Sequence, residues 1–179
     1  MPSNEYHFVT TWRVPATREE VAGILADAPG LVRWWPSVYL GVTVRSPGTA
    51  DGVGRVVDLH TKGFLPYTLR WSFTVTEVRG VDGFALEATG DFVGRGVWTF
   101  EQQGDTCLVT YDWRILAEKG VLKHLSVVMK PIFGANHRWA MARGEESLGL
   151  ELARRRATTE AERARVPPPP RATWPHGRR

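Results

Sequence analysis

A histidine lies on the apolar face of a predicted helix late in the chain. In "FGANHRWAMARGEESLGLEL" (133–152), helical spacing places one stripe together: Phe133, His137, Met141, Gly144, Leu148 and Leu152. If the stripe faces a cavity, the imidazole of His137 can act as general acid or base, or hydrogen-bond a ligand carbonyl. If it faces packed protein, His137 is a core residue satisfied by a neighbouring carbonyl or carboxylate. The sequence leaves both interpretations open.

Other polar residues offer fewer chemistries. Asn136 lies at the edge of the stripe and either orients a ligand or His137, or bridges to a neighbouring strand. Asp91 and Arg95 flank "FVG" and form either a turn or a charged gate. The five histidines show no metal-ligand spacing, and no phosphate-binding loop or nucleophile elbow is present. We therefore expect no metal and no cofactor.

Aromatic residues dominate one face of the predicted strands. In "YTLRWSFTVTEV" (67–78), Tyr67, Leu69 and Trp71 alternate with polar residues. The same alternation in the other strands predicts that one side of the sheet is lined by aromatic residues: Trp71, Phe73, Trp98, Phe100, Tyr111 and Trp113. Trp34, Trp35 and Tyr39 are expected near its entrance. These rings form either plain core or a lined pocket, in which the hydroxyls of Tyr67 and Tyr111 would be hydrogen-bonding groups.

The elements that must position these residues follow a simple order. A strand at 5–14 precedes a helix at 15–27, whose Thr17 and Glu20 have the spacing of a capping box, and a short helix or turn at 29–36. Six strands are then expected, at 39–46, 53–61, 66–79, 83–92, 94–102 and 105–116, with "VGRG" as one turn. Pro131 is expected to kink or break the helical segment that ends near residue 156, giving a short helix at 121–129 followed by a long one from 131.

This order predicts an α+β fold: a curved antiparallel sheet wrapped around a long C-terminal helix, with two short helices after the first strand. The resemblance described next implies that it is a helix-grip fold. Three segments carry a resemblance: "FVTTWRVPATREEVAGILADAPGLVRWWP" (8–36), "GDFVGRGVW" (90–98) and "FGANHRWAMARGEESL" (133–148). They resemble the START-like (SRPBCC) superfamily, which includes polyketide cyclases/dehydratases, aromatase/cyclases and lipid-transfer proteins. The resemblance covers about residues 5–152. It implies a deep hydrophobic cavity roofed by the C-terminal helix, and it leaves the chemistry open.

Charge is divided unevenly along the chain. Residues 154–179 hold eight arginines and two glutamates, whereas residues 1–153 hold fifteen Lys+Arg and seventeen Asp+Glu. We therefore expect a START-like domain at 1–153, a flexible basic tail at 154–179, and no nucleic-acid-binding face on the domain. No signal peptide and no membrane-spanning run is visible, which predicts a cytoplasmic protein.

Three functions remain open. The first is binding of a polyketide-, aromatic- or lipid-like molecule, with cyclisation or dehydration if His137 moves protons and Tyr111 or Asn136 polarises a carbonyl. The second is a carrier or sensor without catalysis, and the third is a protein-interaction module using the tail and exposed tryptophans. For the first two, the expected ligand-binding residues are Trp35, Tyr39, Tyr67, Leu69, Trp71, Phe73, Trp98, Phe100, Tyr111, Trp113, Phe133, Asn136, His137 and Met141.

Overall fold

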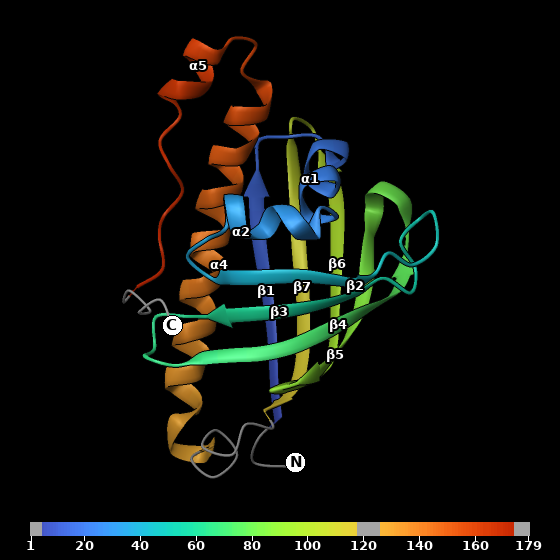
Figure 1. The fold of residues 1–179 in the computed structure, drawn as a ribbon, viewed down its shortest axis with the longest axis vertical. Helices are drawn as coiled ribbons and strands as arrows, with labels where there is room; N and C mark the ends of the chain where they lie inside the picture. The colour runs from blue at the N-terminus through green and yellow to red at the C-terminus, as the bar shows by residue number, and fades with distance from the viewer. Residues whose placement is uncertain (1–4, 118–125, 174–179) are drawn as a thin grey trace.

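Seven antiparallel strands form one curved sheet that wraps around a long C-terminal helix (Figure 1). The computed structural model describes residues 5–117 and 126–173. The strands lie in the order β1-β7-β6-β5-β4-β3-β2, so β1 and β2 are the two edges. Their bounds are β1 (Glu5–Val14), β2 (Tyr39–Ser46), β3 (Val56–Lys62), β4 (Thr68–Val78), β5 (Gly83–Gly90), β6 (Phe92–Gln103) and β7 (Thr106–Ala117). The predicted helix-grip architecture is confirmed.

Short helices follow β1, as the sequence predicts. They are α1 (Arg18–Leu25), the 3-10 turn η1 (Ala28–Gly30) and α2 (Leu31–Trp34), and a second 3-10 turn, η2 (Gly80–Asp82), joins β4 to β5. The capping box is present: the Glu20 backbone N–H donates to Thr17 Oγ1 over 3.2 Å, and the Thr17 N–H donates to the Glu20 carboxylate over 2.9 Å. Two donors that the first helical turn leaves free are thereby satisfied, which fixes where α1 begins.

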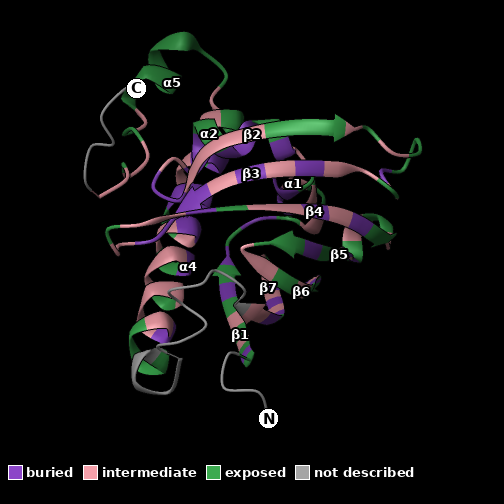
Figure 2. Ribbon diagram, turned by 60° about the horizontal axis from the view of Figure 1, so that its bottom comes forward, coloured by how far each residue is buried: buried purple, intermediate pink, exposed green. Residues whose placement is uncertain are grey.

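The long helix α4 (Ser126–Arg156) turns its apolar stripe towards the sheet. Met141, Leu148 and Leu152 are buried, and Gly144 lies directly against the ring of Trp35. Buried positions alternate with intermediate ones along β3 (Figure 2), and along β1 the outward positions are exposed, as a strand with one core-facing side requires. The core therefore lies between the concave face of the sheet and this stripe.

Ion pairs hold the C-terminal end of α4 to the short helices. The Glu151 side chain is 1% exposed and accepts from Arg33 Nη1 on α2 over 2.7 Å and from Arg155 Nε over 2.8 Å. Arg156 donates to the Glu20 carboxylate on α1, also over 2.7 Å. The helix is thus fixed to α1 and α2 at one end of the cavity.

One predicted turn is wrong. The β5–β6 hairpin turns at Asp91, and "VGRG" (93–96) belongs to β6. The Asp91 carboxylate accepts from the backbone N–H of Arg70 on β4. Gly96 is needed inside the strand because a Cβ there would lie 2.7 Å from the hydroxyl of Tyr111 on β7. Gly96, which resembles a turn signal in the sequence, instead leaves room for a neighbouring aromatic side chain.

Of the kink or break predicted at Pro131, the break does not occur, because α4 is continuous from Ser126. Proline removes a single backbone hydrogen bond, to the carbonyl of residue 127. That carbonyl belongs to the first turn of α4, so only one turn must adjust to the pyrrolidine ring. The N-terminal part of the short helix predicted at 121–129 lies outside the described residues.

After α4 the chain reverses. Helix α5 (Glu160–Arg165) is followed by a segment, residues 166–173, that runs back along α4 towards the β3–β4 turn (Figure 1). Arg154 Nη2 donates to the carbonyl of Pro167. No helix within the described residues is long and apolar enough to cross a membrane. The boundary at residue 153, the flexibility of the tail and the cytoplasmic location stay predictions.

Candidate functional site

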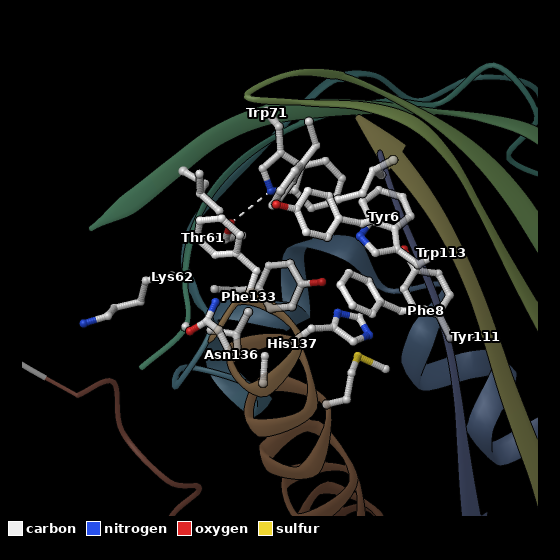
Figure 3. Close-up of a pocket in the computed structure, with 18 of the residues that line it drawn as sticks. Tyr6, Phe8, Thr61, Lys62, Trp71, Tyr111, Trp113, Phe133, Asn136 and His137 are labelled. Carbon is white, nitrogen blue, oxygen red and sulfur yellow. Dashed lines mark hydrogen bonds between the residues drawn. The ribbon is translucent and has the colours of Figure 1, made fainter. Parts of the chain in front are cut away.

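A cavity of about 130 Å³ lies between α4 and the inner face of the sheet. Aromatic side chains from β1, β4, β6 and β7 line the face of the cavity that the sheet provides (Figure 3). None of its lining residues is acidic, and only a few polar groups reach it. An apolar wall with a few polar groups is typical of sites that bind small apolar molecules.

The structure brings most of the predicted site residues together. Eleven line this first cavity: Trp35, Tyr39, Tyr67, Leu69, Trp71, Tyr111, Trp113, Phe133, Asn136, His137 and Met141. The other three, Phe73, Trp98 and Phe100, line a second cavity, which lies between the short helices and the sheet. Their common location follows from the fold, whereas their roles in binding or catalysis stay predictions.

Sequence reasoning missed nine lining residues: Tyr6, Phe8, Val38, Thr61, Lys62, Gly63, Phe92, Ile115 and Ala140. For two of them a signal was present, because Tyr6 and Phe8 alternate with polar residues along β1. The strand pairs with β7 along its whole length, so its inner residues continue the lined face of Trp113. For Lys62 and Gly63, at the end of β3, no local pattern indicates the cavity.

His137 faces the cavity and is held on two sides. Its ring stacks on Phe8, with ring centres 4.3 Å apart, and its Nε2 lies 3.3 Å from Thr10 Oγ1. Burial, with a smaller contribution from the charge of Arg138, lowers the pKa of His137 from 6.5 to about 4. The imidazole is therefore neutral at pH 7, with one nitrogen donating and the other accepting. His137 thus has a hydrogen-bond partner and also borders the cavity.

Several phenols in the cavity wall stay protonated. Burial raises the pKa of Tyr39 and of Tyr111, and it raises the pKa of Tyr67 to about 12. The hydroxyl of Tyr6 is buried and has no hydrogen-bond partner among the described residues. The indole N–H of Trp35, which also borders the cavity, is likewise buried without a partner among those residues. Because unpaired buried polar groups are costly, these two groups are the ones left for a ligand to hydrogen-bond.

Asn136 bridges to the β3–β4 turn at the rim of the cavity. Its Oδ1 accepts from the backbone N–H of Phe64 over 2.9 Å and from that of Leu65 over 3.4 Å. Gly63 permits this approach, because a Cβ there would overlap the Asn136 amide. Of the two roles that the sequence left open for Asn136, the geometry supports bridging to a neighbouring segment.

We expect Asn136→Ala to loosen this turn. The substitution leaves two backbone donors without their acceptor, which should lower the free energy of unfolding by about 1–2 kcal/mol. Hydrogen exchange followed by mass spectrometry should show faster exchange in the peptide containing Phe64 and Leu65. Unchanged exchange in that peptide would contradict the bridging role.

Lys62 anchors the end of the C-terminal segment. Its side chain points away from the aromatic wall (Figure 3), is covered, and donates to the backbone carbonyl of Thr173. The Thr173 hydroxyl in turn lies 3.5 Å from the carbonyl of Gly63. The turn at the rim is therefore contacted by Asn136 on one side and by residue 173 on the other.

Within the described residues, no three His, Cys, Asp or Glu side chains gather in positions that could hold a metal ion. The polar side-chain groups that face the cavity are hydroxyls, indole N–H groups, an amide and an imidazole. These groups can orient a ligand by hydrogen bonds.

Comparison with solved structures places this fold among START-like proteins. An aromatase/cyclase, Zhui from Streptomyces sp. R1128, superposes with a TM-score of 0.63 at 18% identity, covering 86% of this chain and 97% of that one. A START superfamily protein from Mycobacterium smegmatis gives 0.60 at 15% identity, over 79% and 98%. A protein from Thermus thermophilus gives 0.60 at 17% identity, over 80% and 97%.

These likenesses define the class of fold. No protein-family model and no curated protein matches the sequence. The chain has the START-like helix-grip fold, as the resemblance in its sequence implies. At such low identity the neighbours show the fold alone, and the function must be argued from the cavity.

Proposed function

We propose that this protein binds an apolar small molecule, of a polyketide-, aromatic- or lipid-like class, in the cavity between α4 and the sheet. The observation that carries the proposal is the wall itself: Trp35, Trp71, Trp113 and Tyr111 face unfilled space. Protein interiors normally close such gaps, because each unmade contact costs stability. An aromatase/cyclase with the same fold supports this ligand class.

The polar groups of the site favour orientation of a ligand over proton transfer. Tyr6 offers an unpaired hydroxyl, and His137 offers a neutral imidazole. General acid–base catalysis works best when the pKa lies near the working pH, and the pKa of His137 lies far below 7. Of the functions that the sequence left open, we therefore propose binding, with His137 and Tyr6 as hydrogen-bonding partners of the ligand.

Filling the cavity tests this proposal. Ala140 borders the cavity on α4, whereas Ala142, two residues on, is exposed. We expect Ala140→Trp to weaken the binding of 1-octanol at least about tenfold in calorimetric titration, since the new ring occupies the space of several methylene groups. Ala142→Trp is the matched control and should bind as the unchanged protein does.

The test has two outcomes that count against the proposal. One is that the unchanged protein binds no 1-octanol. The other is that Ala140→Trp binds 1-octanol as tightly as Ala142→Trp does. Circular dichroism of both variants shows whether the fold is retained.

A further inference from the structure

A second cavity lies between the short helices and the sheet, and at one end it reaches Asp51 and Arg55 in the β2–β3 loop. Its volume is about 100 Å³. Leu25 of α1 and Leu31 at the start of α2 border it on one side, and Val75, Leu86 and Phe100 of the sheet border it on the other. These side chains are buried members of the apolar core. The chamber therefore suits hydrocarbon, and it lies on the far side of the first cavity from the β3–β4 turn.

The two cavities are neighbours. Four aromatic residues border both of them: Trp35, Tyr39, Trp71 and Tyr111. Because the same side chains face both spaces, one layer of aromatic rings is all that separates the chambers. We call these four residues the aromatic partition.

Two members of the aromatic partition are firmly held. Trp35 is 2% exposed and lies against Gly144 of α4 and Trp12 of β1. Tyr111 is stacked between Trp98 and Trp113, with ring centres 4.1 and 5.5 Å away. Neither ring can turn without disturbing the core around it.

The other two members are less constrained. Tyr39 lies on the edge strand β2, where the pairing with β3 is irregular between Tyr39 and Gly41. Trp71 is held by one hydrogen bond from its indole N–H to Thr61 Oγ1, 3.0 Å long, and by its contacts with neighbouring rings (Figure 3). Rotation of Tyr39 or Trp71 would join the chambers through a narrow gap.

The size of each chamber limits what can occupy it. An apolar cavity of about 150 Å³ holds a single benzene ring. A larger apolar ligand must therefore extend into both chambers, past the aromatic partition. A flexible methylene chain can pass a narrow gap between rings, whereas a rigid fused-ring system cannot.

We infer that the second chamber is a distal subsite for the end of a long acyl chain, and that the aromatic partition selects such chains over fused rings. This inference rests on the proposed function. The polar end of the chain would remain in the first chamber, near the Tyr6 hydroxyl and His137. Chain length then becomes the determinant of affinity, because each added methylene enters apolar surroundings.

Chain-length selectivity tests the inference. Each buried methylene contributes about 0.8 kcal/mol, which is about fourfold in affinity. We expect the unchanged protein to bind tetradecanoate at least about 100-fold more tightly than octanoate in calorimetric titration. A rigid polycycle such as pyrene-1-carboxylate should bind no more tightly than octanoate.

Variants that fill only the second chamber should remove this selectivity. Ala22 on α1 and Val78 on β4 border the second chamber and not the first. In Ala22→Leu, and independently in Val78→Phe, we expect tetradecanoate affinity to fall about tenfold and octanoate affinity to change less than twofold. Gly23→Leu is the matched control, because a side chain at Gly23 meets open space.

The outcomes separate this inference from the proposed function. Suppose that octanoate binds, that Ala140→Trp abolishes this binding, and that both second-chamber variants keep the full preference for tetradecanoate. The assignment of a distal subsite is then wrong, and the proposed function stands. An equal loss of affinity for both chain lengths in the second-chamber variants would also contradict the assignment of a distal subsite. If the unchanged protein binds neither 1-octanol nor octanoate, both proposals fail.

Discussion

Replacing Gly144 by alanine is expected to destabilise the protein, although alanine is the better helix former. A Cβ at Gly144 would lie less than 3.0 Å from three atoms of the Trp35 ring. Trp35 is buried and packed against Trp12, Trp34 and Tyr39, so the ring has little room to retreat. Overpacking of this kind costs about 1–3 kcal/mol, and because three ring atoms would overlap at once we expect the cost to exceed the helix-propensity gain of about 1 kcal/mol.

Gly149 provides the matched control on the same helix. It is exposed, and a Cβ there meets no atom within 4 Å. Gly149→Ala should therefore raise the free energy of unfolding by up to about 1 kcal/mol, because only the propensity term acts. Urea denaturation of the two variants should show changes of opposite sign. A gain in both would mean that α4 does not approach Trp35 as closely as the structure indicates.

This contrast shows which parts of the fold the sequence could predict. Both glycines lie in one helical pattern, and helical spacing places Gly144, but not Gly149, in the apolar stripe. Periodicity therefore identified the face of α4 that meets the sheet. The identity of the opposing ring, Trp35, depends on a contact across 109 positions of the chain, which no local pattern carries.

The candidate site divides in the same way. Alternation along β4 correctly predicted that Leu69 and Phe73 are buried. It could not show that Phe73 lies in the second cavity while Leu69 lies in the first, because the aromatic partition is formed by residues from three strands and by Trp35, which follows α2. Lys62 was missed for a related reason. Its partner Thr173 lies far away in the sequence, in a segment whose composition predicts a flexible tail.

His137 should make the stability of the fold depend on pH. Its pKa is about 4 in the folded protein, against 6.5 for an ordinary histidine. The unfolded chain therefore takes up this proton more readily than the folded one, and stability falls as the pH drops from 6.5 towards 4. Above pH 6.5 the contribution is constant, and below pH 4 the loss is complete. A difference of this size corresponds to about 3 kcal/mol.

The measurement compares the unchanged protein with His137→Gln by urea denaturation at several pH values between 7.5 and 4. Other groups titrate in this range, but their contributions largely cancel when the two proteins are subtracted at each pH. Relative to His137→Gln, the unchanged protein should lose about 3 kcal/mol of unfolding free energy as the pH falls from 7.5 to 4. A shift below about 0.5 kcal/mol would contradict the lowered pKa.

Direct titration of the imidazole by NMR decides what this means for function. A midpoint near 4 leaves His137 neutral at pH 7, where it can donate or accept a hydrogen bond but is a weak base. That result favours binding of the ligand over proton transfer to or from it. A midpoint near 6.5 would instead restore the acid–base role, because the imidazole would then exchange protons at the pH of the cell. The cyclisation or dehydration that the sequence left open would regain its catalytic group.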